Sequence, residues 1–478
     1  MNLSSKQFII LSLNFKATMK QIVELQAENI QLKQENAELK LLVLSFQAQV
    51  SSLQADIARL MVSRNSKTSS TPPSHDLARK NHSLREKSGK PSGGQKGHKG
   101  TTLEMSQHPD KTIEYYPEDT CQNCGAMLTN AILHAVESKQ EIVIPPVIFQ
   151  VVAHQNYACI CTHCDTQNKG KLPERLKANI QYHPDVSALV AYFSVWQYLP
   201  FGRLKTMFSS VFNLNISEGT LSNMLVDLNR KALIFAYPEI QRRISQADVV
   251  GSDETGMKVN GKKQWIWTFQ NTKMTLIIAH ARRGYAVIEE YFNQGFPHSY
   301  YVSDCWAAHL KTPAKAHQIC TAHLLRDLNG LIESEPDNCD WSASMKALLL
   351  RALSLKKEMN LDAYQVNNPQ RERLEYEFSS LLSVDLNSVT GKTHTFLKRM
   401  IKHRNSLFTF LYHPAVPPDN NGSERAIRNV KVKSKVSGQF KSDAGAKAFA
   451  VLRSVADTAH KNSQNPLQAF SAIANAYC

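Results

Sequence analysis

The sequence predicts a multidomain protein whose largest part is a mixed α/β domain, preceded by a long coiled-coil helix and a small β domain that binds a metal. Three observations support this prediction. The chain has 478 residues, which is more than one hydrophobic core usually organises. Its apolar residues recur every seven positions near the N-terminus and alternate with polar ones after Gln246. Two Cys-x-x-Cys pairs lie between these regions.

The composition narrows the class of protein. With 42% hydrophobic and 20% charged residues, the chain is typical of a globular protein. Its 56 Lys and Arg against 41 Asp and Glu leave a net charge of +15, which indicates a polyanionic partner, most simply nucleic acid. No stretch reaches the ~20 apolar residues that span a bilayer. The apolar run from Phe8 to Leu13 is too short for a signal peptide. We therefore expect a cytoplasmic protein without membrane contacts.

After a leader over residues 1–19, residues 20–62 are expected to form a parallel coiled coil. Asn29 and Asn36 occupy a positions of the heptad pattern, where Asn favours an in-register dimer. The alternative is one amphipathic helix packed on its own protein, which a strict seven-residue period disfavours. The apolar d positions are Leu25, Leu32, Leu39, Phe46, Leu53 and Leu60.

Residues 63–112 are expected to form a flexible basic linker. The segment is rich in Ser, Pro and Gly, and its Lys and Arg residues face only Asp76 and Glu86 up to Gly100. Such a linker can settle along DNA phosphates. A linker that is merely solvated is an equally good explanation.

Residues 113–172 are expected to form a small zinc-binding β domain. Two Cys-x-x-Cys turns flanking a β-rich stretch fit a tetrahedral zinc ion with four thiolate ligands. One such pair alone can instead be a redox pair. Cys159 and His163 lie beside the second turn, and either can replace one of its cysteines. The four expected ligands are Cys121, Cys124, Cys161 and Cys164.

Residues 173–245 are expected to be a helical DNA-binding region. Helices over 186–201 and 203–212 are followed by a polar turn and a further helix, for which Ser217 is the expected N-cap. Two helices joined in this way resemble a helix-turn-helix, in which Thr220, Ser222 and Asn223 would face a DNA groove. Ordinary helix packing explains the same pattern almost as well.

After Gln246 the chain alternates in the manner of β-strands. We expect strands at 247–256, 264–269 and 275–280, a helix at 285–292, a strand at 299–304 and a strand-like run at 317–323. This order describes a mixed α/β sheet. Asp253 closes the first strand and Asp304 ends the fourth, so both carboxylates can reach one point at the sheet edge.

Glu424 is the best candidate for a third carboxylate, because it opens a helix whose Arg428, Lys431 and Lys435 share its face. Three carboxylates select Mg²⁺ or Mn²⁺. Two such ions about 4 Å apart catalyse phosphoryl transfer.

Each of these carboxylates also has a simpler explanation. Asp304 can cap a helix, Glu424 can be the capping-box partner of Asn421, and the Asp253–Glu254 pair can lie in a polar turn.

Several motifs together resemble those of the DDE transposases of the insertion sequence 66 family. They are Asn65-Ser-Lys, Gly93-Gly-Gln-Lys-Gly-His-Lys-Gly, Gln197-Tyr-Leu-Pro200, Asp253-Glu-Thr-Gly, Val302-Ser-Asp304, Cys320-Thr-Ala-His323 and Asn420-Asn-Gly-Ser-Glu424-Arg-Ala-Ile-Arg428.

The resemblance implies an α/β RNase H-like catalytic domain that begins at 246–330. An α-helical insertion over 331–412 follows, with helices expected at 343–358 and 371–382, and then the catalytic Glu helix and a helical tail over 413–478. It implies a bacterial, nucleoid-associated enzyme that cuts transposon terminal repeats and transfers the strands to target DNA. Asp253, Asp304 and Glu424 would hold two Mg²⁺ or Mn²⁺ ions, and a structural Zn²⁺ would bind upstream. The expected DNA contacts on the Glu helix are Arg425, Arg428, Lys431, Lys433 and Lys435.

A homodimer and small accessory proteins of the same element are the other expected partners. The alternative is a dimeric zinc-containing DNA-binding regulator without catalysis. Thr321 stands where the family usually has Trp, and the family pattern favours Cys159 over Cys164 as a zinc ligand. Cys320 and His323 are expected to support the fold near the site, since a metal held by this pair alone is improbable.

Overall fold

The computed structural model describes residues 5–61, 105–128, 132, 134–142, 149–335, 338–364, 367–389 and 391–476. The predicted basic linker over 63–112 therefore falls mostly outside the described residues, as do the motifs that begin at Asn65 and Gly93.

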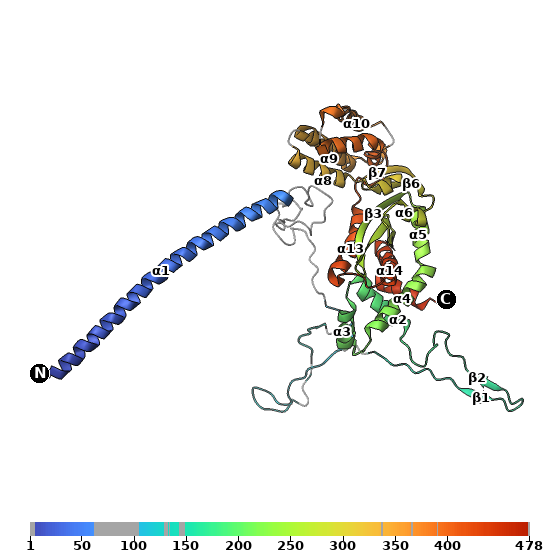
Figure 1. The fold of residues 1–478 in the computed structure, drawn as a ribbon. Coiled ribbons are helices and arrows are strands. Elements are labelled where there is room, and N and C mark those ends of the chain that lie inside the picture. Colours follow the sequence, from blue (N-terminus) through green and yellow to red (C-terminus); the bar gives the residue numbers. More distant parts are fainter. Residues whose placement is uncertain are drawn as a thin grey trace.

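A single long helix, α1 (Ser5–Met61), occupies the N-terminal region and stands clear of the sheet domain in Figure 1. It begins at Ser5 and runs through the described part of the predicted leader over 1–19, where no Pro or Gly interrupts the chain. The apolar heptad side chains that the structure describes, up to Leu53, are exposed, with Leu25 at 64% and Leu39 at 58%. Pairing into a coiled coil stays a prediction. Of the helices that the structure describes, none combines the length and apolar character needed to cross a membrane.

Four helical segments precede the sheet. They are α2 (Pro184–Ala191), which runs into a π-helical turn (Tyr192–Trp196), α3 (Phe201–Phe212), α4 (Glu218–Phe235) and α5 (Tyr237–Ser245). The helix predicted over 186–201 ends early, because Tyr198 adopts a left-handed conformation with φ of 63°. Ser217 is the N-cap of α4 as predicted, since its hydroxyl accepts the Thr220 N–H at 3.0 Å. One face of α4 is part of the main core, which leaves Asn223 on its exposed side.

The central sheet has the strand order β5-β4-β3-β6-β7. β3, β4 and β5 form an antiparallel meander, whereas β6 and β7 run parallel to β3. The strands are β3 (Val249–Val259), β4 (Lys262–Gln270), β5 (Thr275–His280), β6 (Phe296–Ser303) and β7 (Ala314–Ile319).

Two strand predictions need correction. Asp253 does not close the first strand, because β3 pairs with β4 as far as Val259 and places Asp253 mid-strand. A polar turn at Asp253–Glu254 is wrong for the same reason. The run at 317–323 is not one strand either, since β7 ends at Ile319 and α8 begins at Thr321.

Helices cover both faces of the sheet. The rings of Phe269 and Phe292 meet on one face, beside α6 (Tyr285–Tyr291) and α7 (Ala307–Lys311). α13 (Asn421–Ser437) lies against β3 and β4, and α14 (Asp443–Lys461) lies against β5. α15 (Pro466–Asn475) then packs on α2.

A second hydrophobic core belongs to the helices between β7 and α13, at the upper end of the molecule in Figure 1. They include helices where the sequence predicts them, at 343–358 and 371–382. The helices are α8 (Thr321–Ser334), α9 (Cys339–Glu358), α10 (Pro369–Leu382), α11 (Gly391–Lys402) and α12 (Thr409–Tyr412). Short 3₁₀ turns lie at Asp362–Tyr364, Leu386–Ser388 and Arg404–Ser406.

Candidate active site

The parallel pairing of β3 with β6 brings Asp253 and Asp304 to the same level. Gly251 pairs with Val302, and each aspartate lies two residues beyond its member of that pair. Residues two apart in a strand share a face of the sheet. The two carboxylates predicted from the sequence are therefore neighbours at the end of the β6 strand.

Asp253 is poorly solvated and surrounded by negative charge. Its burial, followed by the charges of Glu254 and Asp304, raises its pKa to about 8. A cation bound beside the buried Asp253 carboxyl would remove this repulsion, so the position suits a metal ion. Carboxylate oxygens are the ligands that Mg²⁺ and Mn²⁺ prefer, so this donor set fits the ions expected here.

Asp304 has a local role as well. Its Oδ1 accepts the Trp306 N–H at 2.9 Å, which organises the turn into α7. Asp304 is nevertheless not a helix cap, because α7 begins at Ala307, its N-cap is Trp306 and no side chain caps it. The bond leaves the second carboxylate oxygen available to a cation.

A buried network on the opposite face of β3 holds this turn in place. Glu254 Oε2 lies 2.8 Å from His309 Nε2, and Arg283 donates to Glu254 Oε1 at 2.6 Å. Burial alone would raise the pKa of Glu254, but the bonds from His309 and Arg283 hold it below its usual value. His309 lies on α7, five positions after Asp304, so the network fixes Asp304 relative to β3. Nothing in the local sequence pattern links these three residues.

Asn420 attaches the start of α13 to the strand that carries Asp253. Its side-chain amide donates to the Ser252 carbonyl at 2.6 Å, and its Oδ1 accepts the Ser423 hydroxyl at 2.7 Å. Its backbone N–H points to Cys320 Sγ at 3.2 Å. α13 has no side-chain cap bond, so the capping-box explanation for Glu424 is wrong.

Two glycines allow α13 to approach the sheet this closely. A Cβ on Gly251 would lie 2.9 Å from Asn420 Oδ1 and 3.0 Å from Ser423 Oγ. A Cβ on Gly422 would lie 2.5 Å from the Gln270 side chain. The glycines of the motif and of β3 are therefore explained by the close packing of the first turn of α13 against β3.

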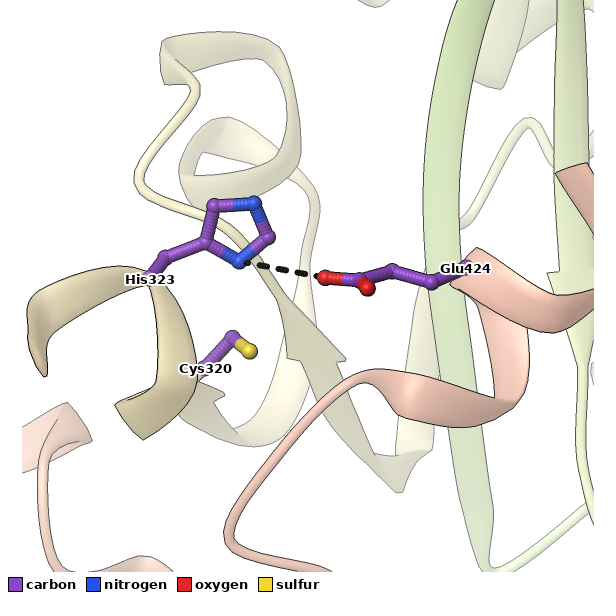
Figure 2. Close-up of side chains that lie close together, drawn as sticks. All are labelled: Cys320, His323 and Glu424. Carbon is purple, nitrogen blue, oxygen red and sulfur yellow. Dashed lines mark ion pairs between the residues drawn. The ribbon is translucent and has the colours of Figure 1, made fainter. Parts of the chain in front are cut away.

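Glu424 faces the start of α8 rather than the two aspartates. Arg326 donates to Glu424 Oε1 at 2.8 Å, and His323 Nδ1 lies 3.8 Å from the same oxygen. Figure 2 shows Cys320 and His323 of α8 converging on Glu424 of α13. The ligand atoms of these three residues lie within 4.8 Å of one another. Across the described ranges, Asp253, Asp304 and Glu424 do not form a set this tight.

The pair Asp253 and Asp304 nevertheless lies close to the second cluster, in which Cys320 and His323 converge on Glu424. The charge of Asp304 affects the pKa of Asp253, and it also acts on the pKa of His323. The pKa of His323 is lowered by its burial and by Arg326, whereas Glu424 and Asp304 oppose this effect. Asp304 therefore lies near both clusters.

The basic residues of α13 divide into exposed and packed groups. Arg425, Arg428 and Lys435 are exposed. Lys431 Nζ donates to the Gly256 carbonyl and Lys433 Nζ donates to the Ser194 carbonyl, both at 3.3 Å. Burial lowers the pKa of Lys433 to about 8, so the structure uses this side chain in packing.

Each Cys-x-x-Cys pair forms a tight turn. The Gly125 N–H bonds the Cys121 carbonyl, and the Asp165 N–H bonds the Cys161 carbonyl, both at 2.9 Å. Both Gly125 and Asp165 have positive φ. The second turn joins strands β1 (Ala158–Ile160) and β2 (Gln167–Lys169), and Cys159 lies exposed on β1.

These turns favour thiolates, yet they lie apart. Backbone N–H groups of Asn123 and Cys124 lower the pKa of Cys121, and Thr166 lowers that of Cys164. The thiolate character and the turn geometry fit zinc. No three of these cysteine sulfurs come within 4.8 Å of one another in the described part of the chain.

Two models of known protein families match parts of this chain. A family model described as "Transposase IS66 family" matches residues 179–448, more than half of the chain, including all three carboxylates. A model of a family of unknown function (DUF6444) matches residues 16–104, which include most of α1. No curated protein matches the chain.

Proposed function

Because the chain belongs to the transposase IS66 family, we propose that it is a DDE transposase that cuts transposon-end DNA and transfers the strand into target DNA. Membership of this family makes the protein a DNA-binding, DNA-processing enzyme of transposition. The divalent-metal chemistry and the residues assigned to it below are our proposal.

The pairing of Asp253 with Asp304 across adjacent parallel strands carries the proposal. A regulator that only binds DNA gains nothing from a second carboxylate beside the buried Asp253, because the two negative charges repel each other and this repulsion costs stability. The strand order β5-β4-β3-β6-β7, with an antiparallel meander followed by two parallel strands, supports an RNase H-like catalytic domain. The family match does not favour a non-catalytic regulator.

We assign Asp253 to a position shared between two Mg²⁺ or Mn²⁺ ions, Asp304 to one ion and Glu424 to the other. When bound, such ions activate the attacking oxygen and stabilise the leaving oxygen. Asn420 and Ser423 hold the base of α13 against β3, and Glu424 would exchange its Arg326 partner for the ion that it shares with Asp253. The same in-line displacement serves twice: water cuts the end, and the freed 3′-hydroxyl then attacks target phosphate.

Other parts of the chain would grip the DNA. Exposed Arg425, Arg428 and Lys435 lie on the helix that carries Glu424 and suit phosphate contacts. Thr220, Ser222 and Asn223 at the start of α4 remain candidates for groove contacts. A structural Zn²⁺ in the cysteine turns, a homodimer through α1 and accessory proteins of the element complete the proposal. The protein would act on the bacterial nucleoid in the cytoplasm.

The test is cleavage and strand transfer on a duplex made from the terminal sequences of the element that encodes this chain, with Mg²⁺. Asp253→Asn, Asp304→Asn and Glu424→Gln keep side-chain size and remove a ligand charge, so each should abolish cleavage. DNA binding should survive, because removing negative charge cannot weaken attraction to phosphates. Glu289→Gln, at an exposed carboxylate on α6, is the matched control and should cut normally. Near-wild-type cleavage by any of the first three variants removes that residue from the site.

A further inference from the structure

We propose that Cys320, His323 and Glu424 form a second cation site, selective for Zn²⁺-like ions, that competes with the Mg²⁺ site for Glu424. The three side chains come from two elements far apart in sequence, the start of α8 and the first turn of α13. Their ligand atoms already lie within 4.8 Å of one another, and Figure 2 shows them pointing to one space.

The Cys320 sulfur is buried and already receives a backbone N–H, that of Asn420 at 3.2 Å. Burial raises the pKa of the free thiol to about 11, while the N–H groups of Asn420 and His323 act in the opposite direction. Backbone N–H groups directed at sulfur are the kind of outer contact that orients and stabilises a metal-bound thiolate.

His323 supplies the second observation. Its Nδ1 is buried and has no hydrogen-bond partner among the described residues. A buried polar atom without a partner costs free energy, so its position calls for an explanation. Nδ1 lies 3.8 Å from Glu424 Oε1, which is close to the separation of two ligands on one zinc ion. An ion between them would satisfy this nitrogen.

The donor set decides which ion fits. Sulfur and imidazole ligands favour Zn²⁺ and related transition metals, and Mg²⁺ does not take thiolate. Three protein ligands leave a fourth position to water or to another group. Ions bound here would hold Glu424 away from Asp253 and Asp304. This inhibitory consequence rests on the proposed function, whereas ion binding itself does not.

Arg326 gives the proposal a distinctive test. Its guanidinium lies 2.8 Å from the oxygen of Glu424 that the ion would use, so its charge opposes ion binding. Removing that charge should tighten ion binding. If the cluster is only an ion pair between α8 and α13, removing the Arg326 charge should loosen that contact, and the variant should bind no ion there.

The experiment titrates the full, reduced chain with Co²⁺, whose thiolate charge-transfer absorption reports sulfur ligation. The cysteine turns also contain thiols, so variants are compared by the number of ions bound per chain. Cys320→Ala and His323→Ala should each bind one ion fewer than the parent chain. Cys339→Ala removes a half-buried cysteine at the start of α9 and should change nothing. Arg326→Met should keep the number of ions and bind the weakest-held one about tenfold more tightly.

An unchanged number of ions in Cys320→Ala overturns the site, as does unchanged or weaker binding in Arg326→Met. Arg326→Met serves as the independent measurement if Cys320→Ala fails to fold. Zn²⁺ should also inhibit Mg²⁺-dependent cleavage, at about tenfold lower concentration in Arg326→Met. If Co²⁺ binds as expected but no DNA is cut under any condition, the proposed function fails and the cation site stands.

Discussion

Two regions of the molecule position their functional side chains in different ways. One is the carboxylate region, around Asp253, Asp304 and Glu424, and the other consists of the two cysteine turns. Asn420 bonds Ser252 across 168 positions of sequence, and Glu424 meets Arg326 across 98. In the cysteine turns, by contrast, Cys121 bonds Ala126 and Cys161 bonds Thr166, and each turn is complete within a few residues. The first region is therefore held by its own tertiary packing. The second consists of preformed turns, which the proposed zinc ion would bring together.

α1 belongs with the cysteine turns in this comparison. Its backbone is satisfied internally, yet its apolar heptad side chains are exposed. Exposed apolar stripes of this length indicate a missing partner. The two regions should respond differently when packing, charge or partners are changed.

The largest expected effect concerns the charge of Asp253 in chain free of divalent ions. Below about pH 4 this carboxyl is protonated in both the folded and the unfolded chain. Between there and about pH 8 the unfolded chain loses the proton first, so the free energy of unfolding falls as pH rises. The loss is at most about 6 kcal/mol. Asp253→Asn should flatten this profile in chemical denaturation, whereas Asp165→Asn in the exposed second cysteine turn should leave it unchanged. A steep profile in Asp253→Asn would contradict the assignment.

Asn420→Ala should destabilise the carboxylate region by about 3 kcal/mol, because the Ser252 carbonyl and the Ser423 hydroxyl lose their partner. Cleavage should fall as well, since α13 is no longer held against β3. Asn421→Ala, at the exposed neighbouring position, is the control and should cost less than about 0.5 kcal/mol. Equal stability of the two variants in urea denaturation would show that Asn420 does not secure α13.

Chelation should affect only the second region. Removing zinc from the purified chain should expose residues 115–172 to limited proteolysis while the segment from Pro184 onward stays resistant. Cys121→Ser should mimic this without chelator. Metal analysis that finds no zinc in freshly purified, reduced protein would count against the whole assignment.

A peptide spanning residues 20–62 should be helical and dimeric, because a helix with an exposed apolar stripe is marginal alone. Asn29→Val with Asn36→Val should raise its thermal stability and broaden the range of oligomers in sedimentation. A peptide that is unstructured and monomeric at micromolar concentration would contradict the predicted coiled coil.

The smallest expected effect distinguishes two cations on one helix. Arg428→Ala removes an exposed charge and should lower the slope of log K against log salt for DNA binding by about 1. Lys433→Ala should leave that slope unchanged and lower stability instead, because its ammonium bonds the Ser194 carbonyl. Identical salt slopes in the two variants would mean that exposure on α13 does not predict DNA contact.

The sequence by itself determined the features that depend on neighbours along the chain. Alternating apolar residues predict the strands later seen as β4 and β5, and Ser217 is the N-cap expected from its side chain. The tight turns at the two cysteine pairs are of this kind, since their hydrogen bonds close within six positions. Asp304 is placed correctly at its strand end for the same reason, because the polar residue follows directly after buried β6.

Only the tertiary structure decided which side chains meet. Asp253 was expected at a strand end, but β3 continues to Val259 because β4 pairs with it from Gly251 to Val259. The partners of Glu254 and the approach of Glu424 to α8 have no local signal. They depend on the order of strands in the sheet and on a close contact that two glycines permit. Periodicity reports which face of an element is buried, and it carries no information about which distant residue buries it.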